Sequence, residues 1–207
     1  MVAPQSQQTP LLPTKLALRR TVKAQRGSRP TADRERVERA IAAVGLELPR
    51  LRRAQCVAVY ASLPEEPGTT LLRAGLRELG IRVLLPVVGD GRRLDWAQDQ
   101  GELAEAGTLR LPEPPGPRFG PAEIGQAQVI MVPALAVDTT GTRLGRGGGY
   151  YDTALTQADP QALILALVHD VEVLDAETTP IPREPHDIGM HGVITPTRWM
   201  FFSPAPA

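Results

Sequence analysis

The residues best suited to chemistry gather between positions 138 and 152, where five glycines and two arginines precede a predicted helix. Three of the glycines, at 147–149, are consecutive, so backbone N–H groups there can approach an anion closely and adopt positive φ without steric cost. The N-terminus of the following helix adds unpaired N–H donors and a partial positive charge. Because Arg143 and Arg146 are placed to neutralise phosphate oxygens, the segment predicts a phosphate-binding loop.

A carboxylate and two tyrosines follow the glycines. Asp152 offers the kind of ligand that Mg²⁺ takes when the ion also bridges phosphates. The segment is not a Walker A loop, because Tyr150 and Tyr151 stand where that loop needs a Lys-Ser/Thr pair, and it is not a GxGxxG motif, because position 150 is not glycine. A flexible surface loop between a strand and a helix is the alternative that composition alone leaves open.

Short apolar runs that alternate with helices are expected to position this loop. Helices are predicted over 15–25, 31–44, 69–79 and 150–157, with Thr31 as the N-cap of the second, and strands over 56–60, 81–88, 129–132, 162–168 and 192–195. Residues 56–88 form a predicted βαβ unit, and the irregular stretch 89–128 is expected to be a hairpin plus a surface loop. The pattern predicts an α/β domain with a mostly parallel central sheet flanked by helices, over residues 14–200. Residues 1–13 are expected to be an unordered tail and residues 201–207 a C-terminal tail.

Composition excludes several classes of protein. The 207 residues include 23 basic and 23 acidic side chains, so the net charge is +0, without the positive field of a dedicated nucleic-acid binder. The single cysteine, Cys56, cannot form an intramolecular disulfide, which fits a reducing cytoplasm. Apolar runs are far shorter than the ~20 residues of a membrane span, and the first residues have no signal-peptide core. We therefore expect a cytoplasmic protein with no nucleic-acid or membrane partner.

The run from Pro133 to Asp152, with Gly141-x-Arg143-Leu-Gly-Arg-Gly-Gly-Gly-Tyr-Tyr-Asp152 at its end, resembles the signature of 5-formyltetrahydrofolate cyclo-ligases, also called 5,10-methenyltetrahydrofolate synthetases. The resemblance extends over about residues 15–195. The weaker matches follow the family's order: Lys15-x-x-x-Arg19, Tyr60-x-Ser62…Glu66-x-x-Thr69, Leu85-Pro86, Pro112-Glu113-Pro114, and Glu184-x-His186-Asp187.

This resemblance implies a fold similar to the NagB/RpiA/CoA-transferase-like fold and an enzyme that depends on ATP and Mg²⁺. Such an enzyme converts 5-formyltetrahydrofolate into 5,10-methenyltetrahydrofolate, ADP and phosphate. In the family mechanism ATP phosphorylates the formyl oxygen, and N10 of the folate then attacks the formyl carbon as phosphate leaves. The expected partners are these small molecules, and a monomer is the default.

The resemblance also implies roles for individual residues. Arg146 is expected to be catalytic, because it would bind the transferring phosphate. The expected ATP-binding residues are Lys15, Arg19, Arg143, Gly145, Arg146, Gly147, Gly148, Gly149, Tyr150 and Tyr151. Ser62, Glu66 and Tyr151 are expected to contact the folate, which would lie between loops 62–69 and 112–120, and Asp152 and Asp187 are expected to hold the metal ion.

Two positions depart from the family pattern. Gly148 stands where some members have lysine, and His191 stands where a second acid is expected four residues after Asp187. These departures leave open a related nucleotide-binding module that has lost cyclo-ligase activity. A phosphate-sugar or CoA-handling enzyme of similar fold is a third hypothesis, since fold does not fix function.

Overall fold

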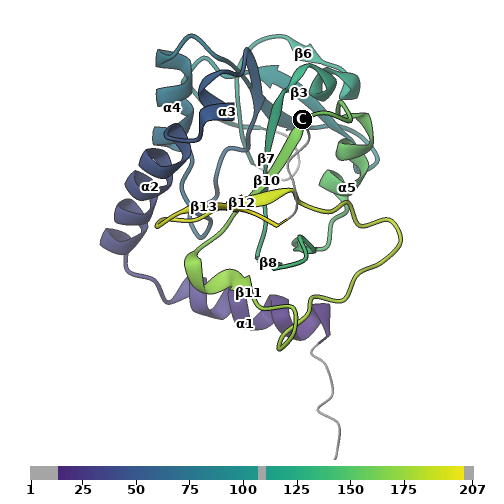
Figure 1. Cartoon of the computed structure of the whole chain (residues 1–207). Coiled ribbons are helices and arrows are strands. Elements are labelled where there is room, and N and C mark those ends of the chain that lie inside the picture. The colour runs from purple at the N-terminus through teal and green to yellow at the C-terminus, as the bar shows by residue number, and fades with distance from the viewer. Residues whose placement is uncertain (1–13, 107–110, 203–207) are drawn as a thin grey trace, which may run out of the picture.

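An eight-stranded sheet lies at the centre of the computed structural model, which describes residues 14–106 and 111–202 (Figure 1). Along the sheet the strands are β13 (Trp199–Phe201), β12 (Gly192–Ile194), β10 (Leu163–Leu167), β7 (Val129–Pro133), β1 (Cys56–Ala58), β2 (Arg82–Val88), β3 (Leu94–Gln98) and β6 (Arg118–Phe119). From β12 to β2 neighbouring strands are parallel, whereas β13, β3 and β6 pair antiparallel at the two edges. The predicted mostly parallel α/β sheet is therefore confirmed.

Helices cover both faces of this sheet. Val57 of β1 packs with residues of α2 (Thr31–Leu46), α3 (Pro49–Arg52) and α4 (Thr70–Glu78). Its neighbours Cys56 and Ala58 pack on the opposite face, with residues of η1 (Pro121–Gln126), α5 (Tyr150–Ala154) and η2 (Leu155–Gln157). In Figure 1, α2, α3 and α4 accordingly lie on one side of the sheet and α5 on the other. Burial on both faces explains why the central strands are continuous apolar runs.

A smaller layer lies below the main sheet in Figure 1 and includes α1 (Lys15–Gly27). Its three-stranded sheet has the order β11 (Val173–Leu174), β8 (Ala136–Asp138) and β9 (Arg143–Leu144). Val22 of α1 packs on this layer in one cluster with Leu135, Leu144 and Ile181. The remaining elements are the pair β4 (Ala104–Ala106) and β5 (Leu111–Glu113), and η3 (Asp170–Glu172). The layer matters for function because it places α1 beside the glycine-rich segment that follows β9.

Most predicted elements are present, and α3, β8, β9 and β11 are additional elements. Other differences concern the start of α2, residues 89–128 and the C-terminal boundary. Pro30 precedes α2 in an extended conformation and occupies its N-cap position, so Thr31 is the first helical residue and not the predicted cap. Within 89–128, which was expected to be a hairpin plus a surface loop, β4 and β5 form an antiparallel pair, but β3 and β6 also join the main sheet as antiparallel strands. β13 ends at Phe201, one residue beyond the predicted domain boundary. The expected tail at 1–13, and all but the first two residues of the expected tail at 201–207, lie outside the described residues.

Among the described residues, no helix is both long enough and apolar enough to cross a lipid bilayer. Cys56 is buried in β1, and burial raises the pKa of its thiol, as expected for an unreactive core cysteine. Trp96 of β3 is fully buried in the sheet core.

Stability is expected to fall in acid because His169, two residues after the end of the parallel strand β10, is buried. Burial is the main cause that lowers the pKa of its imidazole to about 4. Between pH 6.5 and 4 the unfolded chain therefore binds a proton that the folded chain does not, so this contribution, on the order of 3 kcal/mol, is lost as the pH falls through that window. Thermal unfolding of the wild type should show Tm falling from pH 7 to pH 4.5. His169→Gln should show a clearly flatter dependence, and equal slopes for the two proteins would contradict the assignment.

Candidate functional site

A cavity of about 400 Å³ opens at the carboxyl ends of β1, β2 and β7. The chain leaves β1 toward β2 on one side and later returns to place β7 on the other, so the cavity lies at the point where the strand order reverses. This is where open α/β sheets bind ligands. Its lining includes Tyr60, Ala61, Leu63, Glu66, Pro86, Val88, Leu94, Leu111, Pro112, Glu113, Pro133, Ala134, Arg143, Gly145, Arg146, Gly147, Gly148, Gly149, Tyr150, Tyr151 and Asp152.

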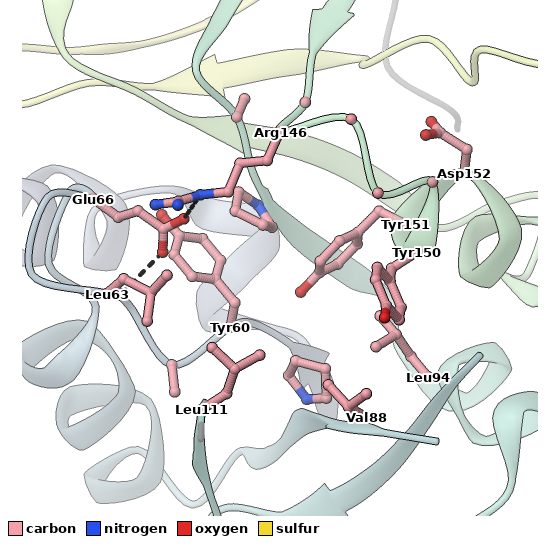
Figure 2. A pocket seen from close by; sticks show the side chains of 18 of the residues that line it. Tyr60, Leu63, Glu66, Val88, Leu94, Leu111, Arg146, Tyr150, Tyr151 and Asp152 are labelled. Atoms are coloured by element: carbon pink, nitrogen blue, oxygen red, sulfur yellow. Dashed lines mark hydrogen bonds and ion pairs between the residues drawn. The ribbon is translucent and has the colours of Figure 1, made fainter. Parts of the chain in front are cut away.

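Residues predicted from the glycine-rich segment lie together in this cavity. Arg143 and residues 145–152 all line it, and Glu66, which is distant in sequence, lies across from them (Figure 2). Four other predicted site residues, Lys15, Arg19, Ser62 and Asp187, are outside its lining. The structure thus gathers most of the predicted site around one cavity.

The glycine loop, residues 145–149, is held at both ends. Before it, the buried carboxylate of Asp138 accepts hydrogen bonds from the backbone N–H groups of Thr142 and Ile181, both at 3.0 Å, which fixes the turn into β9. Gly147 and Gly149 have φ of 100° and 75°, in the left-handed region that favours glycine, and Gly149 directly precedes α5. Gly148 does not have positive φ, so the expectation of that conformation at 147–149 holds at two of the three positions.

Arg143 is buried beneath the glycine loop, and its side chain connects two segments of the chain. Its Nη1 donates to the carbonyl oxygen of Pro133 at 3.2 Å, and its Nη2 donates to Oδ1 of Asp152 at 2.7 Å. It therefore joins the end of β7 to the first turn of α5. Asp152, the predicted metal ligand, is in this way fixed by an ion pair at the edge of the cavity. A carboxylate is the kind of oxygen ligand that Mg²⁺ prefers.

Arg146 reaches across the cavity instead of into the protein. Its Nε donates to Oε1 of Glu66 at 3.0 Å (Figure 2). Its Nη2 lies 3.6 Å from Oε2 of Glu65. The Glu66 side chain is 6% exposed and its other oxygen accepts from the N–H of Leu63 at 2.9 Å. Glu66 and Arg146 thus connect the loop after β1 to the glycine loop.

Two tyrosine hydroxyls lie in the cavity between these loops. The hydroxyl of Tyr151 is buried, has no hydrogen-bond partner among the described residues, and points into the cavity in Figure 2. Tyr60 donates weakly to the carbonyl oxygen of Pro67, at 3.4 Å. Burial, followed by the negative charge of Glu66, raises the pKa of both tyrosines, so both remain protonated donors at neutral pH.

The two predicted residues of α1 lie behind the glycine loop. Arg19 donates from Nε to the carbonyl oxygen of Gly145 at 2.9 Å. Lys15 donates from Nζ to Asp187 at 2.7 Å and to Glu184 at 3.1 Å. Burial alone would lower the pKa of Lys15, but these carboxylates raise it, so the amine stays charged. α1 therefore brings Arg19 to the glycine loop and Lys15 to residues 184–187, and neither residue lines the cavity.

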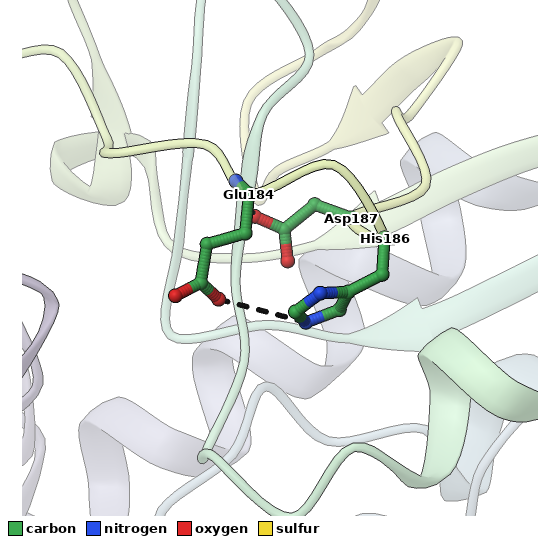
Figure 3. A group of neighbouring side chains, drawn as sticks. All are labelled: Glu184, His186 and Asp187. Atoms are coloured by element: carbon green, nitrogen blue, oxygen red, sulfur yellow. Dashed lines mark hydrogen bonds and ion pairs between the residues drawn. The ribbon is translucent and has the colours of Figure 1, made fainter.

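Asp187 and Asp152, the two predicted metal ligands, have different neighbours. Ligand atoms of Asp187, Glu184 and His186 lie within 4.8 Å of one another, and Figure 3 shows the three side chains together. Asp152 is outside that group and pairs with Arg143.

Ser62 and His191 each accept a hydrogen bond from a backbone N–H group and so hold a neighbouring segment in place. Ser62 Oγ accepts from the N–H of Thr69 at 3.1 Å, which holds the loop that enters α4. His191 Nδ1 accepts from the N–H of Ile164 at 2.9 Å, which ties the ring to β10. Neither residue lines the cavity, so the structure lends no contact to the predicted role of Ser62 in binding substrate.

The cavity lining includes residues of the two loops, 62–69 and 112–120, that were expected to enclose the folate, but the other residues of its apolar part were not predicted. Leu63, Val88, Leu94 and Leu111 form this part with Tyr60 (Figure 2). Glu113, whose Oε1 accepts from the N–H of Val88 at 2.9 Å, holds β5 against the end of β2. The apolar wall is the part of the cavity formed by Leu63, Val88, Leu94, Leu111 and Tyr60. In the sequence, the Pro112-Glu113-Pro114 motif could have indicated it. The cavity thus pairs an apolar region with a glycine loop that carries arginines.

Comparisons with known proteins agree on one family. A model of the 5-formyltetrahydrofolate cyclo-ligase family matches residues 12–196. The 5-formyltetrahydrofolate cyclo-ligase of Mycolicibacterium smegmatis is 45% identical over 147 residues, which cover 69% of this chain and 74% of that protein. The enzyme of the same name from Escherichia coli (strain K12) is 30% identical over 151 residues, or 70% and 80% of the two chains. The NMR structure of Aquifex aeolicus 5,10-methenyltetrahydrofolate synthetase is similar in fold, with a TM-score of 0.76 at 24% identity over 93% of this chain and 95% of that one.

Proposed function

Because the chain belongs to the 5-formyltetrahydrofolate cyclo-ligase family, we propose that it uses ATP and Mg²⁺ to convert 5-formyltetrahydrofolate into 5,10-methenyltetrahydrofolate, ADP and phosphate. The chief support is that one cavity holds both a glycine loop with arginines, suited to phosphates, and an apolar region, suited to a pteridine. A cytoplasmic, monomeric enzyme acting on these small molecules is part of the proposal.

In the proposed reaction the triphosphate lies along residues 145–149 with its terminal phosphoryl group beside Arg146. The formyl oxygen attacks that phosphorus and ADP leaves, which gives an iminium phosphate at N5. N10 then attacks the formyl carbon, the C–O bond to phosphate breaks, and N10 loses its proton. Phosphoryl transfer needs charge neutralisation and alignment more than a covalent nucleophile, which matches a site of arginines and backbone N–H groups.

The other residues of the cavity position the two substrates. Glu66 and the hydroxyls of Tyr60 and Tyr151 offer hydrogen-bonding groups to the folate beside the apolar wall. Asp152 would hold Mg²⁺ together with phosphate oxygens, and the ion would neutralise charge on the triphosphate. Arg19 supports the glycine loop from behind through the carbonyl oxygen of Gly145.

The test is a direct assay. Purified protein mixed with Mg·ATP and 5-formyltetrahydrofolate should develop the near-ultraviolet absorption band of the conjugated methenyl product, with ADP formed in equal amount. If ATP binds and no band appears, the chain is a nucleotide-binding module without this activity. If ATP does not bind, the proposed function is wrong.

Gly148→Val should weaken ATP binding because a Cβ at this position would lie 2.9 Å from the Tyr150 ring. The ring must turn away, and a displacement that costs about 1.4 kcal/mol raises the KM for ATP on the order of tenfold. Steady-state kinetics with varied ATP measure the effect. Gly120→Val is the matched control, because Gly120 has φ of −68° and a Cβ there meets nothing within 4 Å. An unchanged KM for ATP in Gly148→Val would place the phosphates elsewhere.

A further inference from the structure

The ion pair between Glu66 and Arg146 joins two loops that the proposed function assigns to different substrates. The residues are 80 positions apart, and their side chains meet at 3.0 Å across the cavity (Figure 2). Arg146 is on the glycine loop, where the phosphates of ATP would lie. Glu66 is on the loop that borders the apolar wall, where the pteridine would lie. Without ligands, the two charged side chains therefore pair with each other.

We propose that Glu66 and Arg146 couple the two binding events, so that ATP and the folate each bind more tightly when the other is present. The inference rests on the proposed function. A phosphate that binds Arg146 withdraws the guanidinium from Glu66. The freed carboxylate then needs a donor, and the N–H groups of a reduced pteridine supply one.

The burial of the two side chains explains why the exchange favours both ligands together. Arg146 is 41% exposed, so its guanidinium can turn to a phosphate or to water at little cost. Glu66 is only 6% exposed, and without Arg146 it keeps the N–H of Leu63 as its hydrogen-bond donor. A buried carboxylate that loses its cation is unfavourable. Binding of ATP alone is weakened by the free energy of leaving Glu66 without its cation, whereas binding of ATP with the folate is not. A coupling of this kind changes the affinity for both ligands by the same factor.

The charge of Glu66 also acts on the interior of the cavity. After burial, Glu66 is the next cause that raises the pKa of both Tyr60 and Tyr151, which line the same wall. Its carboxylate, held by Arg146 and the N–H of Leu63, is therefore close enough to act on both hydroxyls of the cavity. Glu65 differs, because its side chain is 50% exposed and its oxygen is 3.6 Å from Arg146, so water can replace that contact.

The experiment is calorimetric titration of a non-hydrolysable ATP analogue with Mg²⁺ into the full-length protein, with and without saturating 5-formyltetrahydrofolate. In the wild type the folate should tighten nucleotide binding by about fivefold or more. In Glu66→Gln the nucleotide alone should bind up to about fivefold more tightly than to the wild type, because Arg146 is already released, and the folate should no longer tighten it. Glu65→Gln, the matched control, should retain the wild-type coupling.

Arg146→Gln removes the same ion pair from its other end and should also abolish the coupling, which provides a second test if Glu66→Gln does not fold. Coupling that is absent in the wild type, or that persists in both Glu66→Gln and Arg146→Gln, would overturn the inference. If the methenyl band nevertheless forms in the wild type, the proposed function stands and the coupling alone is wrong. If the wild type binds no nucleotide and gives no band, both are wrong.

Discussion

Arg146→Ala is expected to lower kcat by about a hundredfold or more while changing the KM for 5-formyltetrahydrofolate by less than about threefold. The guanidinium lies at the glycine loop, with its Nε 3.0 Å from Glu66, and its exposure leaves it able to turn toward the terminal phosphate. A donor aimed at charge that develops in the transition state typically contributes a factor of about 10² to 10³ in kcat. The folate keeps its apolar wall and gains an unpaired Glu66, so its binding should persist.

Steady-state kinetics with each substrate varied in turn measure this effect. Arg146→Lys should recover only part of the loss, because lysine restores the charge but not the planar fork of donors. Arg20→Ala, on the exposed surface of α1, is the control and should retain wild-type kcat. If Arg146→Ala raised the KM for the folate and left kcat unchanged, Arg146 would be a substrate-binding residue without a role in phosphoryl transfer.

The part of the site that sequence could predict is the part that is local in the chain. Gly145, Arg146, Gly147, Gly148, Gly149, Tyr150, Tyr151 and Asp152 are contiguous, and all line the cavity. The pairing of Glu66 with Arg146 spans 80 residues, and no pattern in the chain shows that their side chains meet. The same limit applies to Lys15, whose match to the family says nothing of its ion pair with Asp187.

The fold can be predicted from the sequence where buried segments have long apolar patterns. Buried parallel strands such as β10 are uninterrupted apolar runs, and α4 has its apolar residues at helical spacing, so both were expected close to their observed bounds. Edge strands leave a weaker signal. β6 has two residues and β13 has three, and neither is buried on both faces, so their sequences do not differ from loop.

A buried ion pair between α1 and η3 was also beyond sequence reasoning, and its loss is expected to be costly. Arg26 and Glu172 are each 2% exposed, with Nε to Oε1 at 2.7 Å and Nη2 to Oε2 at 2.6 Å. Arg26 also donates to the carbonyl oxygen of Ala134 in the cavity wall, and Glu172 accepts from the N–H of His169. The pair therefore joins the helix that holds Lys15 and Arg19 to the segments that follow β7 and β10.

Glu172→Gln should lower the free energy of unfolding by about 3–5 kcal/mol, because it leaves the guanidinium of Arg26 buried without a counter-charge. That is a large fraction of the 5–15 kcal/mol that is usual for a folded protein. Urea unfolding followed by circular dichroism measures it. Asp33→Asn is the control. It removes a carboxylate that pairs with Arg29 at 2.9 Å and with Arg36 at 2.5 Å, and it should cost much less because both pairs are accessible to water.

The double variant Arg26→Met/Glu172→Gln separates the unpaired charge from the lost hydrogen bonds. If the charge causes the loss, removing the guanidinium as well should leave the double variant no less stable than Glu172→Gln, although it also gives up the contact with Ala134. The single variant Arg26→Met completes the comparison. If the losses of unfolding free energy in Arg26→Met and Glu172→Gln add up to the loss in the double variant, Arg26 and Glu172 contribute independently, each through its own backbone partner. Non-additivity of about 2 kcal/mol or more is the expected result, because Arg26 has only 2% exposure and water cannot replace the carboxylate there.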